Sequence, residues 1–127
     1  MTVMEDTVFL MIGSRHLAMG LAALLLSVPP LRTVERVASF DGVLERMTRG
    51  RRPALVVLDT DKLGARTAAV VERVQHVSPE TRCLVLSDSV AEQRELASNG
   101  VDSVVKGADP RGLVGAIEQL LSDGAAD

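Results

Sequence analysis

Short apolar runs alternate with stretches of helical periodicity along the chain, and this alternation restricts the folds that it can adopt. Strands are predicted at 7–13, 31–37, 54–59, 81–86 and 101–105. Helices are predicted at 15–27, 41–48, 66–77, 90–98 and from Pro110 onward. Strands separated by single helices form a parallel sheet with right-handed crossovers and helices on both faces. We therefore predict an α/β fold with a doubly wound, five-stranded parallel sheet and five helices.

The length and apolar content of the chain are those of one compact domain. Its 127 residues, 46% of them apolar, suffice to bury roughly two-thirds of the surface that the unfolded chain exposes. No linker or low-complexity segment divides residues 1–127. We expect a single domain with a core at about 7–122 and a frayed tail at 123–127.

The charge of the chain argues against nucleic-acid binding. The formal net charge is -3, so phosphate backbones are not attracted in general and a local basic patch would be needed. The candidate patch consists of Arg46, Arg49, Arg51 and Arg52. We interpret it as a solvated loop at a helix end, and we expect no direct binding of nucleic acid.

Two further features indicate a reducing, cytoplasmic setting. Cys83 is the only cysteine, which excludes an intrachain disulfide and a site of several thiolates, and we expect it to be a buried, inert thiol. Acidic residues precede the first apolar run, which argues against a secretory signal.

The uncharged stretch at 16–31 is broken by glycine, serine and proline, so it predicts a buried helix and not a membrane span.

Three predicted strands end in polar residues of different kinds. Asp59 follows ALVVL, Ser87 follows RCLVL and Lys106 follows VDSVV. The carboxyl ends of neighbouring parallel strands face one crevice, where ligands bind. The carboxylate, the hydroxyl and the ammonium are therefore expected to converge on one small anion such as a phosphoryl group.

With these residues on its third, fourth and fifth strands, the chain resembles the receiver domain of bacterial response regulators over nearly its whole length. Four segments carry a closer likeness to the NarL/FixJ subfamily: GLAALLLSVPPLRTVERVASFDGVLERM, RRPALVVLDTDKLG, PETRCLVLSDS and KGADPRGLVGAIEQLL. The resemblance implies a flavodoxin-like sheet with strand order 2-1-3-4-5 and a part in two-component signal transduction. Helix-turn-helix output domains normally follow such receivers, which implies transcription regulation.

The resemblance also implies roles for the three strand-end residues. Asp59 would be the phosphoacceptor, which forms an aspartyl-phosphate when a histidine kinase or a small phosphodonor presents a phosphoryl group. Lys106 would neutralise charge on the phosphoryl oxygens, and Ser87 would hydrogen-bond one of them.

The chain departs from the family where the metal is held. Receivers hold Mg²⁺ with an acidic pair after the first strand, but this chain has Gly13 and Ser14 there. Asp61, two residues beyond Asp59, either gives weak metal binding or faces water. We expect no metal or other cofactor, weak or absent phosphorylation, and a stable Asp59–Lys106 ion pair.

Other departures concern the switch. Ser103 stands three residues before the lysine, where receivers usually have Tyr or Phe, and Lys62 and Leu63 stand where Met-Pro is common.

Three functions follow from these observations. The favoured one is an atypical receiver, not an enzyme, that acts by contacts with a protein partner or a second copy. Its candidate surfaces are the first helix and a face formed by the 90–98 helix, the 101–105 strand and the last helix, with charges at Glu92, Arg94, Glu95, Arg111 and Glu118. The second is an orthodox Mg²⁺-dependent phospho-receiver. The third is a small flavodoxin-like enzyme or ligand-binding domain, although His16 and His76 have no partner at catalytic or ligand spacing.

Overall fold

A computed structural model describes residues 4–107 and 109–125 of the chain. These residues include a parallel sheet in the order β2-β1-β3-β4-β5. The strands are β1 (Thr7–Met11), β2 (Thr33–Arg36), β3 (Leu55–Asp59), β4 (Arg82–Ser87) and β5 (Ser103–Val105). The predicted doubly wound sheet and its strand order are confirmed.

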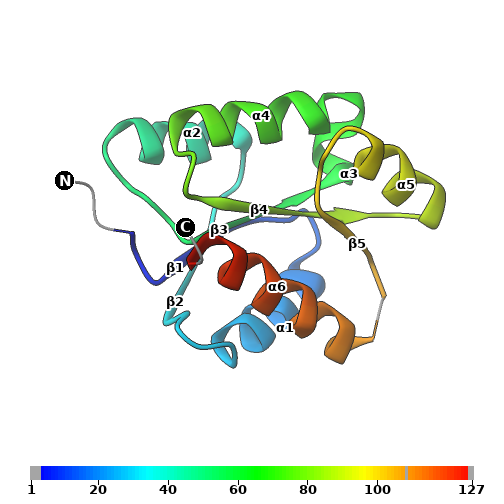
Figure 1. The fold of residues 1–127 in the computed structure, drawn as a ribbon, viewed down its shortest axis with the longest axis horizontal. Helices are drawn as coiled ribbons and strands as arrows, with labels where there is room; N and C mark the ends of the chain where they lie inside the picture. The colour runs from blue at the N-terminus through cyan, green and yellow to red at the C-terminus, as the bar shows by residue number, and fades with distance from the viewer. Residues whose placement is uncertain (1–3, 108, 126–127) are drawn as a thin grey trace.

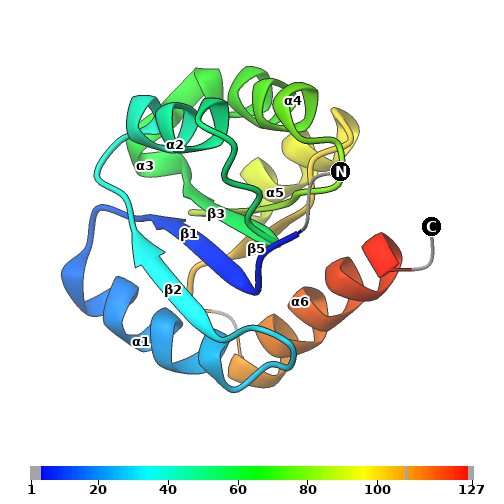
Figure 2. The same ribbon diagram turned by 90° about the vertical axis from the view of Figure 1, so that its left-hand side faces the viewer.

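Helices cover both faces of this sheet. They are α1 (Arg15–Leu26), α2 (Phe40–Thr48), α3 (Thr60–Leu63), α4 (Thr67–Val77), α5 (Val90–Ser98) and α6 (Pro110–Ala125), with a 3₁₀ turn at Gly64–Arg66. In both views α1 and α6 lie below the sheet, whereas α2, α4 and α5 lie above it (Figures 1 and 2). The five longer helices correspond to the predicted ones, and the single-turn helix α3 was not predicted.

Serine side chains fix the starts of three helices. Ser14, Ser39 and Ser89 each accept a hydrogen bond from a backbone N–H in the first turn of α1, α2 and α5. A side-chain oxygen at this position satisfies one of the free N–H groups at a helix start.

The predicted tail at 123–127 lies partly within the last helix. Helix α6 continues to Ala125, and residues 126 and 127 lie outside the described part of the chain.

The sheet is buried on both faces, which explains the continuous apolar runs of its strands. Along β1, Val8 and Leu10 pack with α1 and α6, whereas Phe9 and Met11 pack with α2, α4 and α5. Within the described residues, no helix has both the length and the apolar character needed to cross a bilayer.

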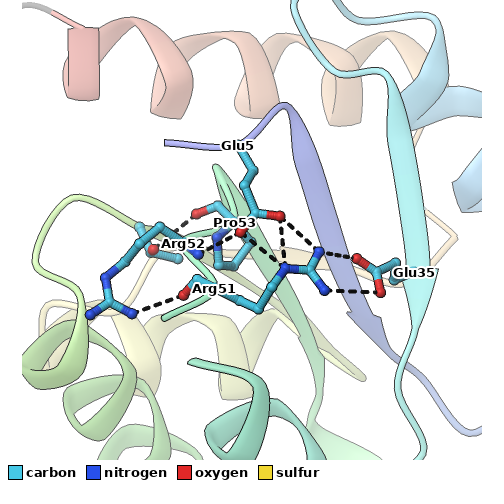
Figure 3. Close-up of polar contacts among 6 residues, drawn as sticks. Glu5, Glu35, Arg51, Arg52 and Pro53 are labelled. Atoms are coloured by element: carbon cyan, nitrogen blue, oxygen red, sulfur yellow. Dashed lines mark hydrogen bonds and ion pairs between the residues drawn. The ribbon is translucent and has the colours of Figure 1, made fainter. Parts of the chain in front are cut away.

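A charged network closes the amino end of the sheet (Figure 3). The Arg51 guanidinium donates to Glu5, with Nη2 2.7 Å from Oε1, and to Glu35 in β2, and it lies 5.2 Å from the centre of the Phe9 ring. The backbone N–H of Arg52 donates to Glu5 Oε2 at 2.6 Å. The hydrogen bond from Arg51 holds the pKa of Glu5 below its ordinary value, although partial burial opposes the shift.

The prediction of a solvated arginine loop is therefore wrong for Arg51 and Arg52. Glu5 lies next to them because β1 and β3 are paired, and a partly buried guanidinium needs such partners. Arg49 agrees with the prediction, since it directly follows α2, is exposed, and pairs with Glu45 in the last turn of that helix.

Candidate functional site

The three predicted polar residues lie at the same edge of the sheet. Asp59 is the last residue of β3, Ser87 is the last residue of β4, and Lys106 directly follows β5. The register pairs Asp59 with Leu86 and Ser87 with Val105, so the carboxyl ends of the three strands are nearly level.

Asp59 and Lys106 form the predicted ion pair. Lys106 Nζ lies 2.5 Å from Asp59 Oδ1, and the Asp59 side chain is 3% exposed. The same carboxylate oxygen accepts the backbone N–H of Asp61 at 2.9 Å and thereby caps α3. A carboxylate at a strand end, which receivers use as a nucleophile, is here held by a cation and a backbone donor.

Lys106 binds two further carboxylates. Its Nζ is 2.8 Å from Asp61 Oδ2 and 2.9 Å from Asp88 Oδ1. An ammonium has three N–H donors, so all of them are engaged. Asp61 is largely exposed, as one alternative expected, but it pairs with Lys106 instead of facing water alone. Asp88 was not predicted, although its place directly after Ser87 puts it at the same edge.

These contacts favour the charged forms of Lys106 and Asp61. Burial opposes the charge on Lys106, but its hydrogen bonds to Asp59, Asp61 and Asp88 outweigh burial and raise its pKa above the ordinary value. The hydrogen bond from Lys106 lowers the pKa of Asp61. The Lys106 ammonium thus lies among three aspartate side chains.

The hydroxyl of Ser87 points away from this cluster. Ser87 is fully buried, and its Oγ donates to the Val104 carbonyl of β5 at 3.2 Å. The backbone N–H of Lys106 donates to the Ser87 carbonyl at 2.8 Å. The structure therefore places Ser87 beside Lys106 through the backbone, with its hydroxyl committed to β5.

Glu92 connects two of the strand ends to α5. Its Oε1 accepts the Thr60 hydroxyl at 2.7 Å and the Asp88 N–H at 3.0 Å. Thr60 follows Asp59, so Glu92 links the loops after β3 and β4. The sequence suggests Glu92 as one of the charges of a contact face. In the structure Glu92 is half-exposed, and its hydrogen bonds to Thr60 and Asp88 direct its carboxylate towards the site.

The residues at this edge do not fit a divalent metal ion. Gly13 offers no side-chain ligand, and the Ser14 hydroxyl accepts the Leu17 N–H at 3.2 Å to cap α1. The carboxylates near Asp59 already surround an ammonium. Among residues 4–107 and 109–125, no group of three or more His, Cys, Asp or Glu is arranged to hold a metal ion.

An apolar cavity of about 320 Å³ lies next to the charged cluster. It is bounded by α1, β5 and the start of α6, and its lining includes Leu17, Leu24, Val104 and the stem of Lys106. His16 lies at its rim and, like His76, is exposed on a helix as predicted. Cys83 is buried, and desolvation raises its pKa to about 12, which agrees with the predicted inert thiol.

Solved structures of response regulators share this architecture. A receiver protein from Sinorhizobium medicae WSM419 has a TM-score of 0.76 and 23% identity, with 93% of this chain and 95% of that one covered. A CheY-like receiver domain protein from Methanospirillum hungatei JF-1 has a TM-score of 0.70 and 15% identity, with 94% and 97% covered. The chain has the fold of a response regulator receiver domain.

A LuxR family DNA-binding response regulator from Silicibacter pomeroyi is similar in the same way. Its TM-score is 0.72 at 22% identity, and the match covers 92% of this chain and 93% of that one. The sequence matches no model of a known protein family and no curated protein. At these identities the likeness establishes the fold, and function has to be argued from the site.

Proposed function

We propose that this chain is an atypical receiver domain of two-component signalling that acts through protein contacts, with weak or absent phosphorylation of Asp59. The observation that carries the proposal is the cluster of Asp59, Asp61 and Asp88 around the Lys106 ammonium. In this arrangement the nucleophile and its cation already satisfy each other.

Phosphoryl transfer to Asp59 is expected to be slow for an electrostatic reason. Catalysis of this reaction depends on positioning and on cations that neutralise the phosphoryl oxygens. A dianionic phosphodonor would approach three carboxylates with Lys106 as the cation among them. The position after β1, where Mg²⁺ ligands would be needed, has Gly13 instead of a carboxylate.

Contacts with another protein do not need this reaction. Helix α1 exposes an apolar surface on which Met19 is 64% and Leu26 is 49% exposed. Helix α5 exposes Arg94 and Glu95 on one face of the sheet, and α6 exposes Arg111 and Glu118 on the other face, where α1 also lies. We propose α1 and the α5–β5–α6 face as the candidate docking surfaces, for a protein partner or for a second copy of the chain.

The experiment that tests the proposal mixes the protein with Mg²⁺ and acetyl phosphate or beryllofluoride, and follows intact mass and backbone NMR. We expect no adduct at Asp59 and no shifts that spread to α6. An acyl-phosphate that is lost in Asp59→Asn would instead favour an orthodox phospho-receiver supplied by a histidine kinase. Sedimentation at several concentrations separates self-association from docking on a partner.

A ligand-binding function is the second candidate, and the apolar cavity between α1 and α6 is the observation that favours it. Pockets of this size and lining commonly hold small molecules. Native mass spectrometry of the purified protein tests it, because a retained small molecule would add a defined mass.

A further inference from the structure

The side chain of Lys62 crosses the carboxyl edge of the sheet beside the position where receivers bind their metal. Lys62 lies in α3, three residues after Asp59. A Cβ atom at Gly13 would lie 3.7 Å from Lys62 Cε and 3.9 Å from Lys62 Cγ, so the lysine stem runs past the end of β1. Its Nζ donates to the backbone carbonyl of Ala38, which follows β2.

A second positively charged side chain lies at the carboxyl ends of β1 and β2. Arg36, the last residue of β2, donates from Nη2 to the Ile12 carbonyl at 3.4 Å. The backbone carbonyls of Ile12 and Ala38 thus both accept from positively charged side chains. At the ends of β1 and β2, the side chains of Lys62 and Arg36 donate to backbone carbonyls. At the ends of β3, β4 and β5, three carboxylates pair with Lys106.

We propose that Lys62 is a specificity-determining residue that excludes divalent cations from this edge by placing a tethered ammonium beside Gly13. The proposal rests on the proposed function and deepens it. It implies that the loss of metal binding has two separable causes, the missing acidic pair and the lysine next to it.

The geometry predicts what happens if a carboxylate is restored. An aspartate at position 13 would begin with its Cβ in van der Waals contact with the Lys62 stem, so its carboxylate would be within reach of the ammonium. A hydrogen bond between an ammonium and a carboxylate is roughly twice as strong as one to a neutral acceptor. Lys62 would therefore leave the Ala38 carbonyl and neutralise the new carboxylate, and Mg²⁺ would have to displace it.

The test compares four proteins by Mg²⁺ titration, with calorimetry and backbone NMR as readouts. They are the natural chain, Lys62→Met, Gly13→Asp/Ser14→Asp, and the triple variant with all three changes. Methionine keeps the stem that lies beside Gly13 and removes the charge. Aspartate at position 14 can still cap α1.

We expect the natural chain and Lys62→Met to show no Mg²⁺ binding and the acidic double variant to bind weakly. The triple variant should bind at least about tenfold more tightly than the double variant, because a nearby like charge has been removed. Lys62→Arg in the acidic background is the matched control, and it should bind as weakly as the double variant.

Equal Mg²⁺ affinity of the double and triple variants would overturn the role of Lys62 and leave the proposed function intact. Tight Mg²⁺ binding by the natural chain would overturn the proposed function itself. If the triple variant does not fold, the role of Lys62 can be tested with Gly13→Asp by backbone NMR in the absence of Mg²⁺. The amides around Ala38 should then shift when Gly13→Asp is made in the natural chain, because Lys62 leaves the Ala38 carbonyl. They should not shift further when Gly13→Asp is made in Lys62→Met, where that hydrogen bond is already absent. Equal changes in the two backgrounds would refute the proposal.

Discussion

The ammonium of Lys106 reaches the carboxylate of Asp59 across the end of β4, which lies between their two strands in the sheet. This is possible because the carboxyl ends of β3, β4 and β5 are level. The contact joins β5, a short strand that pairs only with β4 among the described residues, to the centre of the sheet. The ion pair therefore stabilises the edge strand as well as neutralising Asp59.

Replacing Lys106 with methionine should destabilise the fold by about 2–4 kcal/mol, because it leaves the buried Asp59 carboxylate without its cation. The free energy of unfolding in urea measures this loss. Asp59→Asn is the matched control: the amide oxygen can still cap α3, and Asp61 and Asp88 still neutralise Lys106, so about 1 kcal/mol or less should be lost. A loss below 1 kcal/mol in Lys106→Met would contradict the structural role of the pair.

Replacing Arg51 with alanine should cost roughly 1–3 kcal/mol, because Glu5 and Glu35 lose a shared, partly buried partner. The pKa of Glu5 should rise towards its ordinary value, which NMR titration of the side-chain carboxyl carbon can follow. Arg49→Ala removes an exposed pair within one helix and should cost only about 0.3–0.5 kcal/mol. Equal losses in the two variants would mean that the network in Figure 3 contributes no more than an ordinary surface pair.

The Arg51 network and the Lys106 cluster each set part of the acid sensitivity of the protein. Hydrogen bonds from Arg51 and Lys106 lower the pKa values of Glu5 and Asp61 in the folded state. The stability from these two groups is therefore present above their unfolded pKa values, near 4.5 and 3.8, and is lost as the pH falls through the lower folded values. Urea unfolding at a series of pH values should show this acid loss, and Arg51→Ala should reduce it. An unchanged profile in the variant would contradict the contribution of Glu5.

As the pH rises above 9, the buried thiol of Cys83 should be the first group whose titration lowers the free energy of unfolding. Desolvation raises the pKa of Cys83 from 9.0 to about 12, so the unfolded chain releases this proton at lower pH than the folded protein. The stabilisation is complete below the unfolded value and is lost as the pH rises through the folded one, at up to about 1.4 kcal/mol per pH unit. Unfolding at several pH values between about 9 and 10 should show this slope, and Cys83→Ala should remove it there; above the ordinary lysine value of 10.5, the raised pKa of Lys106 adds a slope of its own. A slope that persists in Cys83→Ala would have to come from another group.

The sheet was predictable from the sequence because strands buried on both faces must be continuously apolar, and single intervening helices impose parallel order. The meeting of Asp59 and Lys106 followed from the rule that carboxyl ends share one edge. Two contacts were not predictable. Arg51 and Glu5 are 46 residues apart and meet through the pairing of β1 with β3. Lys62 reaches Ala38 only because the short helix α3 turns the chain after β3.

The apolar surface of α1 provides the most direct test of function by contact. Met19 and Leu26 are exposed on this helix, and α1 carries no Asp, Glu, Lys or Arg after Arg15. Because Met19 is 64% and Leu26 49% exposed, and glutamine keeps an unbranched stem of similar length, Met19→Gln/Leu26→Gln should lower the free energy of unfolding by no more than about 1 kcal/mol.

The double variant should nevertheless weaken association with a second copy or with a protein partner, since an interface on α1 would lose its apolar contacts. Sedimentation velocity at several concentrations measures the first case. Val90→Gln, which changes an exposed apolar residue of α5, is the matched control. If only Val90→Gln weakens association, the docking surface lies on α5. If only the α1 variant does so, the partner binds the exposed apolar surface of α1 that Met19 and Leu26 form.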